Sequence, residues 1–481
     1  MTTHQSITDT SATDTSNTNT SALHTKPRDY FAARALLASG WANNVLFSVK
    51  DGQFHSFEAN STPTKDCHVL SGPVLPTLAN VHSHAFQRVM AGAAEVSLNP
   101  NDSFWSWRDL MYKIVQKLTP DDARIIATQL YIDMLKAGYT QVGEFHYLHH
   151  DIGGKQYAQV GEMSNQIIAA ADDSGMGLTL LPVLYSHSGF GGQTPNAGQA
   201  RFINTTDSYL ALHQACDKAL ANHARHKLGI CFHSLRAVTK TQIETVLQSL
   251  AKDCPVHIHI AEQQKEVQDS LAFSGQRPVE WLNNEIGLNE RWCLVHATHL
   301  TDAERHAIAK SQAVAGLCPT TEANLGDGIF PAVEFEKENG RWGIGSDSHV
   351  SLSIVEELRT LEYGQRLRDQ QRNRLYRPAQ NSIGDNLYQQ ALLGGNQACG
   401  VALGLTKGNR ADFMVLDESH PFIAASESKD LLNRWLFATN ENLVKDVFVA
   451  GQQRIKDFHH QQEDSSRQAF IQVIKKVMYH A

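Results

Sequence analysis

Short, almost wholly apolar runs alternate with helix-like segments between residues 76 and 405. The runs are too short for helices and lack the alternation of a half-exposed strand, which is typical of parallel strands buried on both faces. Eight strand–helix units in a segment of this length predict a (β/α)8 barrel, whereas a doubly wound open sheet is the alternative. No glycine-rich fingerprint follows the first run, which counts against that alternative. The eight runs are 78–81, 140–144, 178–184, 229–232, 256–260, 292–295, 313–317 and 342–344.

Polar residues with capping spacing mark the starts of several helices between these runs. Residues 119–122 (Thr-Pro-Asp-Asp) are typical of a helix start, and the pattern predicts a helix running to Gly138. Two pairs have the spacing of a capping box: Thr239 with Gln242, and Thr301 with Glu304.

The two ends of the chain have strand-like patterns of a different kind. Residues 44–49 and 53–57 flank an Asp-Gly turn, which predicts a hairpin, and residues 412–417 and 446–451 form a similar pair near the other end. We therefore predict a small β-sandwich domain built from residues 28–75 and 406–460, around a barrel of residues 76–405. Residues 461–481 have helical periodicity, and the polar residues 1–27 are predicted to be a disordered tail.

Composition narrows the classes of partner. The chain is 42% hydrophobic and 19% charged with a formal charge of −8, as in an ordinary soluble globular protein. The mild negative charge argues against nucleic acid or an anionic membrane as a main partner. No run is long enough to span a membrane, and no N-terminal apolar core resembles a secretory signal. The seven cysteines include no Cys-x-x-Cys pair, so we expect a reduced, cytoplasmic protein.

Titratable side chains gather at the ends of the apolar runs, where a barrel places its functional groups. His82 and His84 end the first run and share one face of a strand, so they can hold one divalent metal. His257 and His259 also share a face, and spacing alone does not choose between them. Further polar residues follow four other runs: Glu144 to His150, His233 to Arg236, His296, and Asp347.

This ordered set resembles the amidohydrolase superfamily of metal-dependent hydrolases, and the similarity spans essentially the whole chain. The residues on which this resemblance rests are His82-Ser83-His84, His259, His296 and Asp347. Within the superfamily, the sequence is similar to the formimidoylglutamate deiminase family in the stretches 82–88, 104–108, 143–150, 232–239 and 345–349.

The resemblance implies one divalent metal held by His82, His84, His259 and Asp347. Three imidazoles and one carboxylate suit zinc, with Fe(II) as the alternative. Superfamily members with two metals generally bridge them through a lysine or glutamate at the fourth strand, and the run Ile230–His233 has no lysine, which favours a single ion.

The resemblance also implies the reaction and the roles of the remaining residues. N-formimidoyl-L-glutamate would be hydrolysed to N-formyl-L-glutamate and ammonia, in histidine degradation, by a protein expected to form homodimers. The alternatives are a superfamily deaminase of a nucleobase or other ring amine, and a metal-free scaffold protein, which would require missing ligands. Arginine suits a substrate with two carboxylates, whereas a ring would require stacking and amide groups. The implied catalytic residues are Glu262, His296 and Asp347, and the implied substrate-binding residues are Gln87, Arg108, Tyr147, His233 and Arg236.

Overall fold

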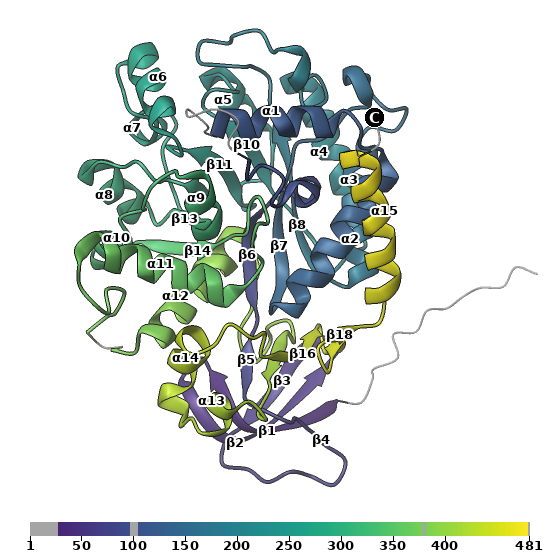
Figure 1. Ribbon diagram of the computed structural model, residues 1–481, viewed down its shortest axis with the longest axis vertical. Helices are drawn as coiled ribbons and strands as arrows, with labels where there is room; N and C mark the ends of the chain where they lie inside the picture. Colours follow the sequence, from purple (N-terminus) through teal and green to yellow (C-terminus); the bar gives the residue numbers. More distant parts are fainter. Residues whose placement is uncertain (1–26, 97–103, 379–380, 480–481) are drawn as a thin grey trace, which may run out of the picture.

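The computed structural model describes residues 27–96, 104–378 and 381–479, which form a barrel ringed by helices and a smaller β-sheet unit at one end of it (Figure 1). The predicted disordered tail, apart from Pro27, lies outside the described residues. The limits predicted for the two units at residues 76 and 405 stay a prediction.

Eight parallel strands form the barrel and confirm the predicted architecture over the open sheet. The strands lie in chain order, and the last is joined to the first by backbone bonds from the N–H groups of Ser346 and Asp347 to the carbonyl of His82, at 3.2 and 3.0 Å. The strands are β6 (Leu78–Ser83), β7 (Tyr139–His146), β8 (Gly177–Leu184), β10 (Ile230–Ser234), β11 (Val256–Ile260), β12 (Trp292–His296), β13 (Val314–Leu317) and β14 (Arg341–Ile344), and β9 (Lys227–Leu228) pairs with β8.

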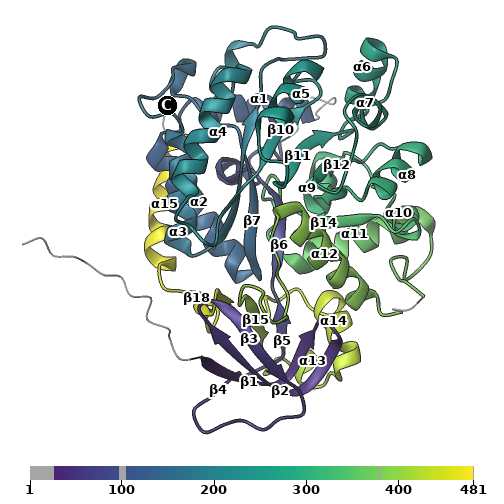
Figure 2. The same cartoon turned by 180° about the vertical axis from the view of Figure 1, so that it is seen from behind.

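Helices surround the barrel, as Figures 1 and 2 show from opposite sides. The capping boxes predicted at Thr239 and Thr301 are confirmed, and Thr119 forms a third with Asp122. None of the described helices is long and apolar enough to cross a bilayer. The helices are α1 (Phe104–Val115), α2 (Pro120–Lys136), α3 (Glu162–Ser174), α4 (Thr206–Leu220), α5 (Lys240–Ser249), α6 (Gln264–Ser274), α7 (Pro278–Glu285), α8 (Asp302–Ser311), α9 (Pro319–Leu325), α10 (Ala332–Lys337), α11 (Ile354–Asp369) and α12 (Ile383–Cys399), with short 3-10 turns η1 (Ala85–Met90), η2 (Ile152–Gly154) and η3 (Ala197–Gln199).

The helix α2 ends at Lys136, two residues before the predicted end at Gly138. Gly138 adopts φ +98°, and a Cβ there would lie 2.7 Å from the sulfur of Met414. Glycine therefore makes the turn into β7 where the barrel meets the small unit.

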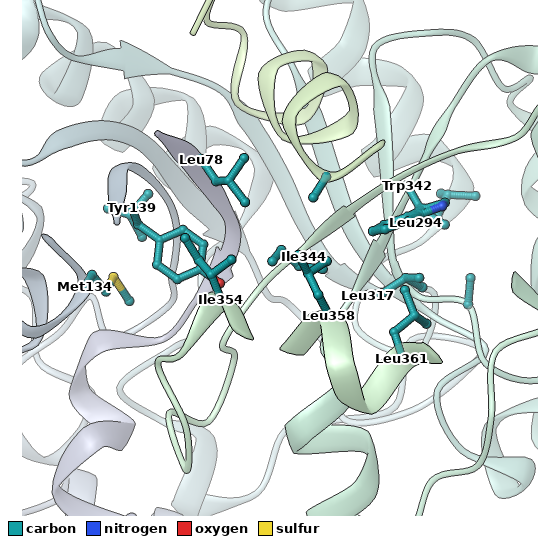
Figure 3. Packing of buried hydrophobic residues seen from close by; sticks show 14 of the residues in the cluster. Leu78, Met134, Tyr139, Leu294, Leu317, Trp342, Ile344, Ile354, Leu358 and Leu361 are labelled. Carbon is teal, nitrogen blue, oxygen red and sulfur yellow. The ribbon is translucent and has the colours of Figure 1, made fainter. Parts of the chain in front are cut away.

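Apolar side chains between the barrel wall and the helices form the main core. Leu317 and Ile344 from the strands pack with Ile354, Leu358 and Leu361 from α11, and all five are at most 5% exposed (Figure 3). This close packing gives the strand ends a rigid base.

The small unit is one nine-stranded sheet from both ends of the chain. Tyr30 on β1 lies 5.7 Å from Phe448 on β16, ring centroid to centroid, although the two strands are three places apart in the sheet. In a flat sheet they would be about 14 Å apart, so this sheet curls into two layers around aromatic rings. Its strands are β1 (Arg28–Leu37), β2 (Gly40–Lys50), β3 (Gln53–Glu58), β4 (His68–Val69), β5 (Val74–Pro76), β15 (Phe413–Leu416), β16 (Val444–Val449), β17 (Gln452–Lys456) and β18 (His459–His460); two short helices, α13 (Pro421–Ala424) and α14 (Ser428–Phe437), follow β15.

The predicted C-terminal helix is α15 (Glu463–Tyr479), which packs along α2. Lys476 bonds Asp122 at 2.7 Å and Lys136 bonds Glu463 at 2.6 Å, so ion pairs join the two helices near both ends.

A buried histidine beside β8 makes the stability of the fold sensitive to acid. The Nδ1 of His226 accepts the backbone N–H of Leu178 at 3.2 Å, and its Nε2–H donates to Asp172 at 3.2 Å. Burial lowers the pKa of His226 to about 4. The unfolded chain binds a proton between pH 6.5 and 4 that the folded chain does not, so His226 contributes stability that is lost as the pH falls through this window, up to about 3 kcal/mol.

The His226→Gln variant retains a hydrogen-bonding side chain that does not titrate. We expect its urea midpoint to fall less than that of the unmodified protein between pH 7 and pH 4.5. All other buried histidines are the same in the two proteins, so equal pH dependence would contradict the role of His226.

Candidate metal and active site

Four side chains from three parts of the barrel converge at the C-terminal ends of its strands. The Nε2 atom of His82 lies 3.1 Å from that of His84 and 3.0 Å from that of His259. The Oδ1 atom of Asp347 lies 3.4 and 3.3 Å from the same atoms of His82 and His84. Adjacent ligand atoms around a tetrahedral zinc ion lie about 3.3 Å apart, so each of these four distances fits two ligands of one ion. The three imidazoles form one group of possible ligands, and Asp347 forms another with His82 and His296.

The protonation of these groups also fits a metal. The Nδ1–H of His84 donates to the carbonyl of Phe145 at 2.8 Å, which leaves the lone pair on Nε2 facing the other ligands. Burial, reinforced by the neighbouring His84, lowers the pKa of His82 to about 3. Burial alone would raise the pKa of Asp347, but the surrounding imidazoles hold it below its usual value. Neutral imidazoles and a carboxylate are the donor forms that zinc binds.

The structure distinguishes the roles of the two histidines on β11, between which the sequence spacing could not choose. His259 joins the cluster, whereas His257 contacts the carbonyl of Ala398 through Nε2 at 2.7 Å. His257 is therefore occupied at the opposite end of the barrel, against the end of α12.

The backbone is strained where the functional strands end. Ala261, His296 and Asp347 have φ values of +51°, +69° and +45°, in the left-handed region that non-glycine residues rarely adopt. Ala261 directly follows β11, His296 is the last residue of β12, and Asp347 is the third residue after β14. Such strain persists where surrounding packing fixes the backbone, and it turns the side chains into the mouth of the barrel.

Carboxylates surround the imidazole of His296. Its Nδ1 lies 3.4 Å from Glu322 Oε1, and its Nε2 lies 3.9 Å from Asp347 Oδ2. Although burial opposes it, the negative charges of Glu262, Glu322 and Asp347 raise the pKa of His296 to about 10. Burial raises the pKa of Glu262 itself, which is the direction expected for a carboxyl group that donates protons in a pocket.

The remaining predicted residues line one pocket that opens onto the cluster. Gln87 is 2% exposed and donates through Nε2 to the hydroxyl of Tyr147 at 2.9 Å, while its Oε1 has no hydrogen-bond partner among the described residues. The pocket thus brings together predicted residues from seven separate stretches of the chain. Its walls include Gln87, Arg108, Tyr147, His233, Arg236, Glu262 and His296 together with the ligands His84, His259 and Asp347.

Two tyrosines of the pocket were not predicted from the sequence. Tyr185 stacks on His233 with ring centroids 4.2 Å apart, and Tyr112 lies beneath the guanidinium of Arg108 at 5.4 Å. Both tyrosines line the pocket. Tyr185 directly follows β8, and Tyr112 is four residues after Arg108 on one helix face, so strand-end position and helical spacing could have identified them.

Two other groups of possible ligands fit a metal poorly. In the first (Asp172, His223 and His226), the Nδ1 of His226 accepts a backbone N–H, so its Nε2 carries the proton and cannot ligate. The second adds Cys318 to His296 and Glu322, and burial raises the pKa of that thiol well above its usual value. A neutral thiol is a poor ligand.

Two family models match the chain. The amidohydrolase family matches residues 74–454, and the model described as formimidoylglutamate deiminase HutF, N-terminal domain, matches residues 30–66.

Individual proteins match along most of their length. A formimidoylglutamate deiminase of Pseudomonas aeruginosa is 57% identical over 93% of this chain and 99% of its own. The crystal structure of an amidohydrolase from Brucella melitensis superposes with a TM-score of 0.90 at 47% identity, covering 94% of this chain and 100% of that one. A zinc-bound adenosine deaminase from Xanthomonas campestris shares the fold at 20% identity, with a TM-score of 0.77 over 92% of this chain and 98% of its own.

Proposed function

Because this chain belongs to the amidohydrolase family, we propose that it is a formimidoylglutamate deiminase that acts in histidine degradation. It hydrolyses N-formimidoyl-L-glutamate to N-formyl-L-glutamate and ammonia. The observation that carries the proposal is one pocket lined both by residues of the metal-ligand cluster and by two arginines, Arg108 and Arg236.

The arginines favour this substrate over a ring amine. Arg108 and Arg236 supply planar, permanently charged donors that match carboxylates, and N-formimidoyl-L-glutamate has two carboxylates. A nucleobase offers no such groups. The ring-amine alternative predicts instead that a purine or pyrimidine is turned over faster than the dicarboxylate.

His82, His84, His259 and Asp347 hold one divalent ion, for which zinc is the best fit and Fe(II) the alternative. When bound, zinc lowers the pKa of a coordinated water to about 7 and so supplies a nucleophile at neutral pH. Asp347, as a carboxylate, would accept a proton from the attacking water. His296, held between Glu322 and Asp347, orients the nucleophile and stabilises its negative charge.

Glu262 moves protons on the substrate. It protonates the imino nitrogen of the H–C=N–H group as water oxygen bonds to the adjacent carbon, and it then delivers a further proton to the departing nitrogen. The bond between that carbon and nitrogen breaks and ammonia leaves. The carbon keeps the water oxygen as the carbonyl of the N-formyl product. The two protons of the water, one accepted by Asp347 and one lost from the hydroxyl of the adduct, replace the two that Glu262 delivers to nitrogen, so the reaction balances.

Gln87, Tyr147 and His233 orient the substrate in the pocket. The free Oε1 of Gln87 is an acceptor for a substrate N–H. Burial and the positive charge of Arg236 keep the pKa of His233 well below its usual value, so a neutral imidazole faces the substrate. Arg108 and Arg236 bind its carboxylates.

The direct test is ammonia release from N-formimidoyl-L-glutamate, run beside formimino derivatives of neutral amino acids and a panel of nucleobases. Turnover that is fastest with the dicarboxylate supports the proposal. Turnover only with nucleobases overturns it.

The Arg236→Met variant tests how the carboxylate is recognised. Methionine keeps much of the length but removes the charge, so we expect kcat/KM for the diacid to fall by about 30- to 1,000-fold, the range for a lost charged hydrogen bond in a closed site. The two monoamides of the substrate, each lacking one carboxylate, are the controls. The monoamide that lacks the carboxylate bound by Arg236 should lose little, and an equal loss for all three compounds would remove Arg236 from carboxylate recognition.

The protein assembles as a homodimer in the cytoplasm. The outer face of α11 supports the dimer, because Leu367 is 80% and Tyr363 40% exposed there, with Ile329 beside Gly364 45% exposed. All seven cysteines are unpaired, which agrees with a reducing compartment. Sedimentation equilibrium should give twice the chain mass of 53.3 kDa; a monomer at micromolar concentration would contradict the dimer.

A further inference from the structure

A carboxylate that takes no part in the proposed reaction lies behind the metal ligands. Glu144 is on β7 and is fully buried. Burying a carboxyl group is unfavourable unless its oxygens are hydrogen-bonded. Both oxygens of Glu144 are: Oε2 accepts the hydroxyl of Ser83 at 2.6 Å and that of Tyr131 at 3.1 Å, and Oε1 accepts the backbone N–H of Ala85 at 2.7 Å.

Two of these donors belong to the segment that carries the first metal ligands. Ser83 lies between His82 and His84, and Ala85 follows directly. Side chains alternate along a strand, so Ser83 faces away from the two imidazoles. Glu144 therefore hydrogen-bonds to the ligand-bearing segment on the side opposite the two imidazoles and does not reach the ion position.

The backbone at this point is not regular and needs such a restraint. The pairing of β6 with β7 runs from Asn80 opposite Val142 to Ser83 opposite Glu144, which leaves one extra residue on β6. Gly143 allows the two strands to approach closely, because a Cβ there would lie 2.6 Å from the carbonyl of Val81. Bulges of this kind redirect side chains at functional sites, and they must be fixed to do so reproducibly.

We infer that Glu144 is a positioning residue for the metal site: its two contacts with Ser83 and Ala85 fix the bulged segment so that the Nε2 atoms of His82 and His84 face a common point. The inference rests on the metal site proposed above but not on the identity of the substrate. Charge supports the same role, because three neutral imidazoles and Asp347 leave a divalent ion with one uncompensated positive charge, and Glu144 provides a buried negative group behind it. Burial raises the pKa of Glu144 to about 7, against the three hydrogen bonds that favour its ionised form; a cation in front favours that form further.

The test measures zinc affinity on the full-length protein, stripped of metal and titrated against a chromophoric chelator. In Glu144→Gln the amide has one acceptor in place of two, so it cannot serve both Ala85 and the two hydroxyls as before. We expect the dissociation constant for zinc to rise by about 10- to 100-fold, the usual effect of losing a group that orients metal ligands. Activity is not needed for this readout.

Two further variants make the result specific. Tyr131→Phe removes a donor to the same oxygen of Glu144 but leaves the ligand segment untouched, so its zinc affinity should stay within about threefold of the unmodified protein. Ser83→Ala removes the hydroxyl contact while keeping the bond from Ala85, so an intermediate loss is expected; it also removes the 3.3 Å contact between Ser83 and His349. The melting temperature of each metal-free protein shows whether the fold itself has changed.

A metal-free Glu144→Gln protein that melts normally and binds zinc within threefold of the unmodified protein would overturn the inference. If Glu144→Gln does not fold, Ser83→Ala decides: unchanged affinity overturns the positioning role and a clear loss supports it. An unmodified protein that binds no zinc would instead overturn the proposed metal site, so the two failures are distinguishable.

Discussion

The His259→Ala variant is expected to lose at least about 1,000-fold in kcat/KM for N-formimidoyl-L-glutamate and to purify with well under one equivalent of metal. The Nε2 of His259 lies 3.0 Å from that of His82, so its removal leaves two imidazoles and one carboxylate around the ion. A bound metal contributes several kcal/mol to stabilisation of a transition state, and each 1.36 kcal/mol corresponds to a tenfold change in rate. Metal analysis and steady-state ammonia release are the measurements.

The same strand provides a matched control. His257 is two residues away, is also buried, and contacts the carbonyl of Ala398. The His257→Gln variant keeps a donor for that carbonyl, so it should retain one equivalent of metal and most of its activity. If both variants lost metal equally, the loss would reflect a disturbed strand, and His259 would have no special role as a ligand.

The Glu262→Gln variant should show the second large effect, a fall in kcat of about 100- to 10,000-fold, which is the usual contribution of a general acid–base group. Glutamine has the same shape but cannot transfer a proton. Glu262 is 5% exposed and lines the same pocket as Arg108 and Arg236, and the substitution leaves both arginines in place. KM should therefore change much less than kcat.

Metal content separates this effect from damage to the metal site. The Glu262→Gln protein should purify with the same equivalent of metal as the unmodified protein, unlike the His259→Ala protein. If the variant kept more than about one tenth of the original kcat, Glu262 would not be the proton-transfer group, because loss of such a group lowers kcat by about 100-fold or more.

Local patterns in the sequence were sufficient for the barrel because each depends on neighbours along the chain. The eight apolar runs correspond to the strands β6, β7, β8, β10, β11, β12, β13 and β14, and the capping boxes at Thr239 and Thr301 start α5 and α8. Capping and strand burial are set within a few residues, so they can be read directly. The end of α2 could not be predicted from neighbouring residues, since Gly138 is constrained by Met414, which is distant in sequence.

Part of the candidate site could also be predicted from local patterns. Strand geometry places titratable residues at the strand ends and puts His82 and His84 on one face, and both features are visible in the sequence. Tyr185 could have been found by the same rule, since it directly follows β8.

What the sequence by itself determined is therefore the architecture and the set of residues able to reach the mouth of the barrel. Only the tertiary structure placed His259 in the cluster and His257 against Ala398, and put Glu144 behind Ser83 and Ala85. The physical reason is that these outcomes depend on the register and closure of strands far apart in the chain. A shift of one residue between β6 and β7 would turn different side chains toward the ion, and no local pattern encodes that register.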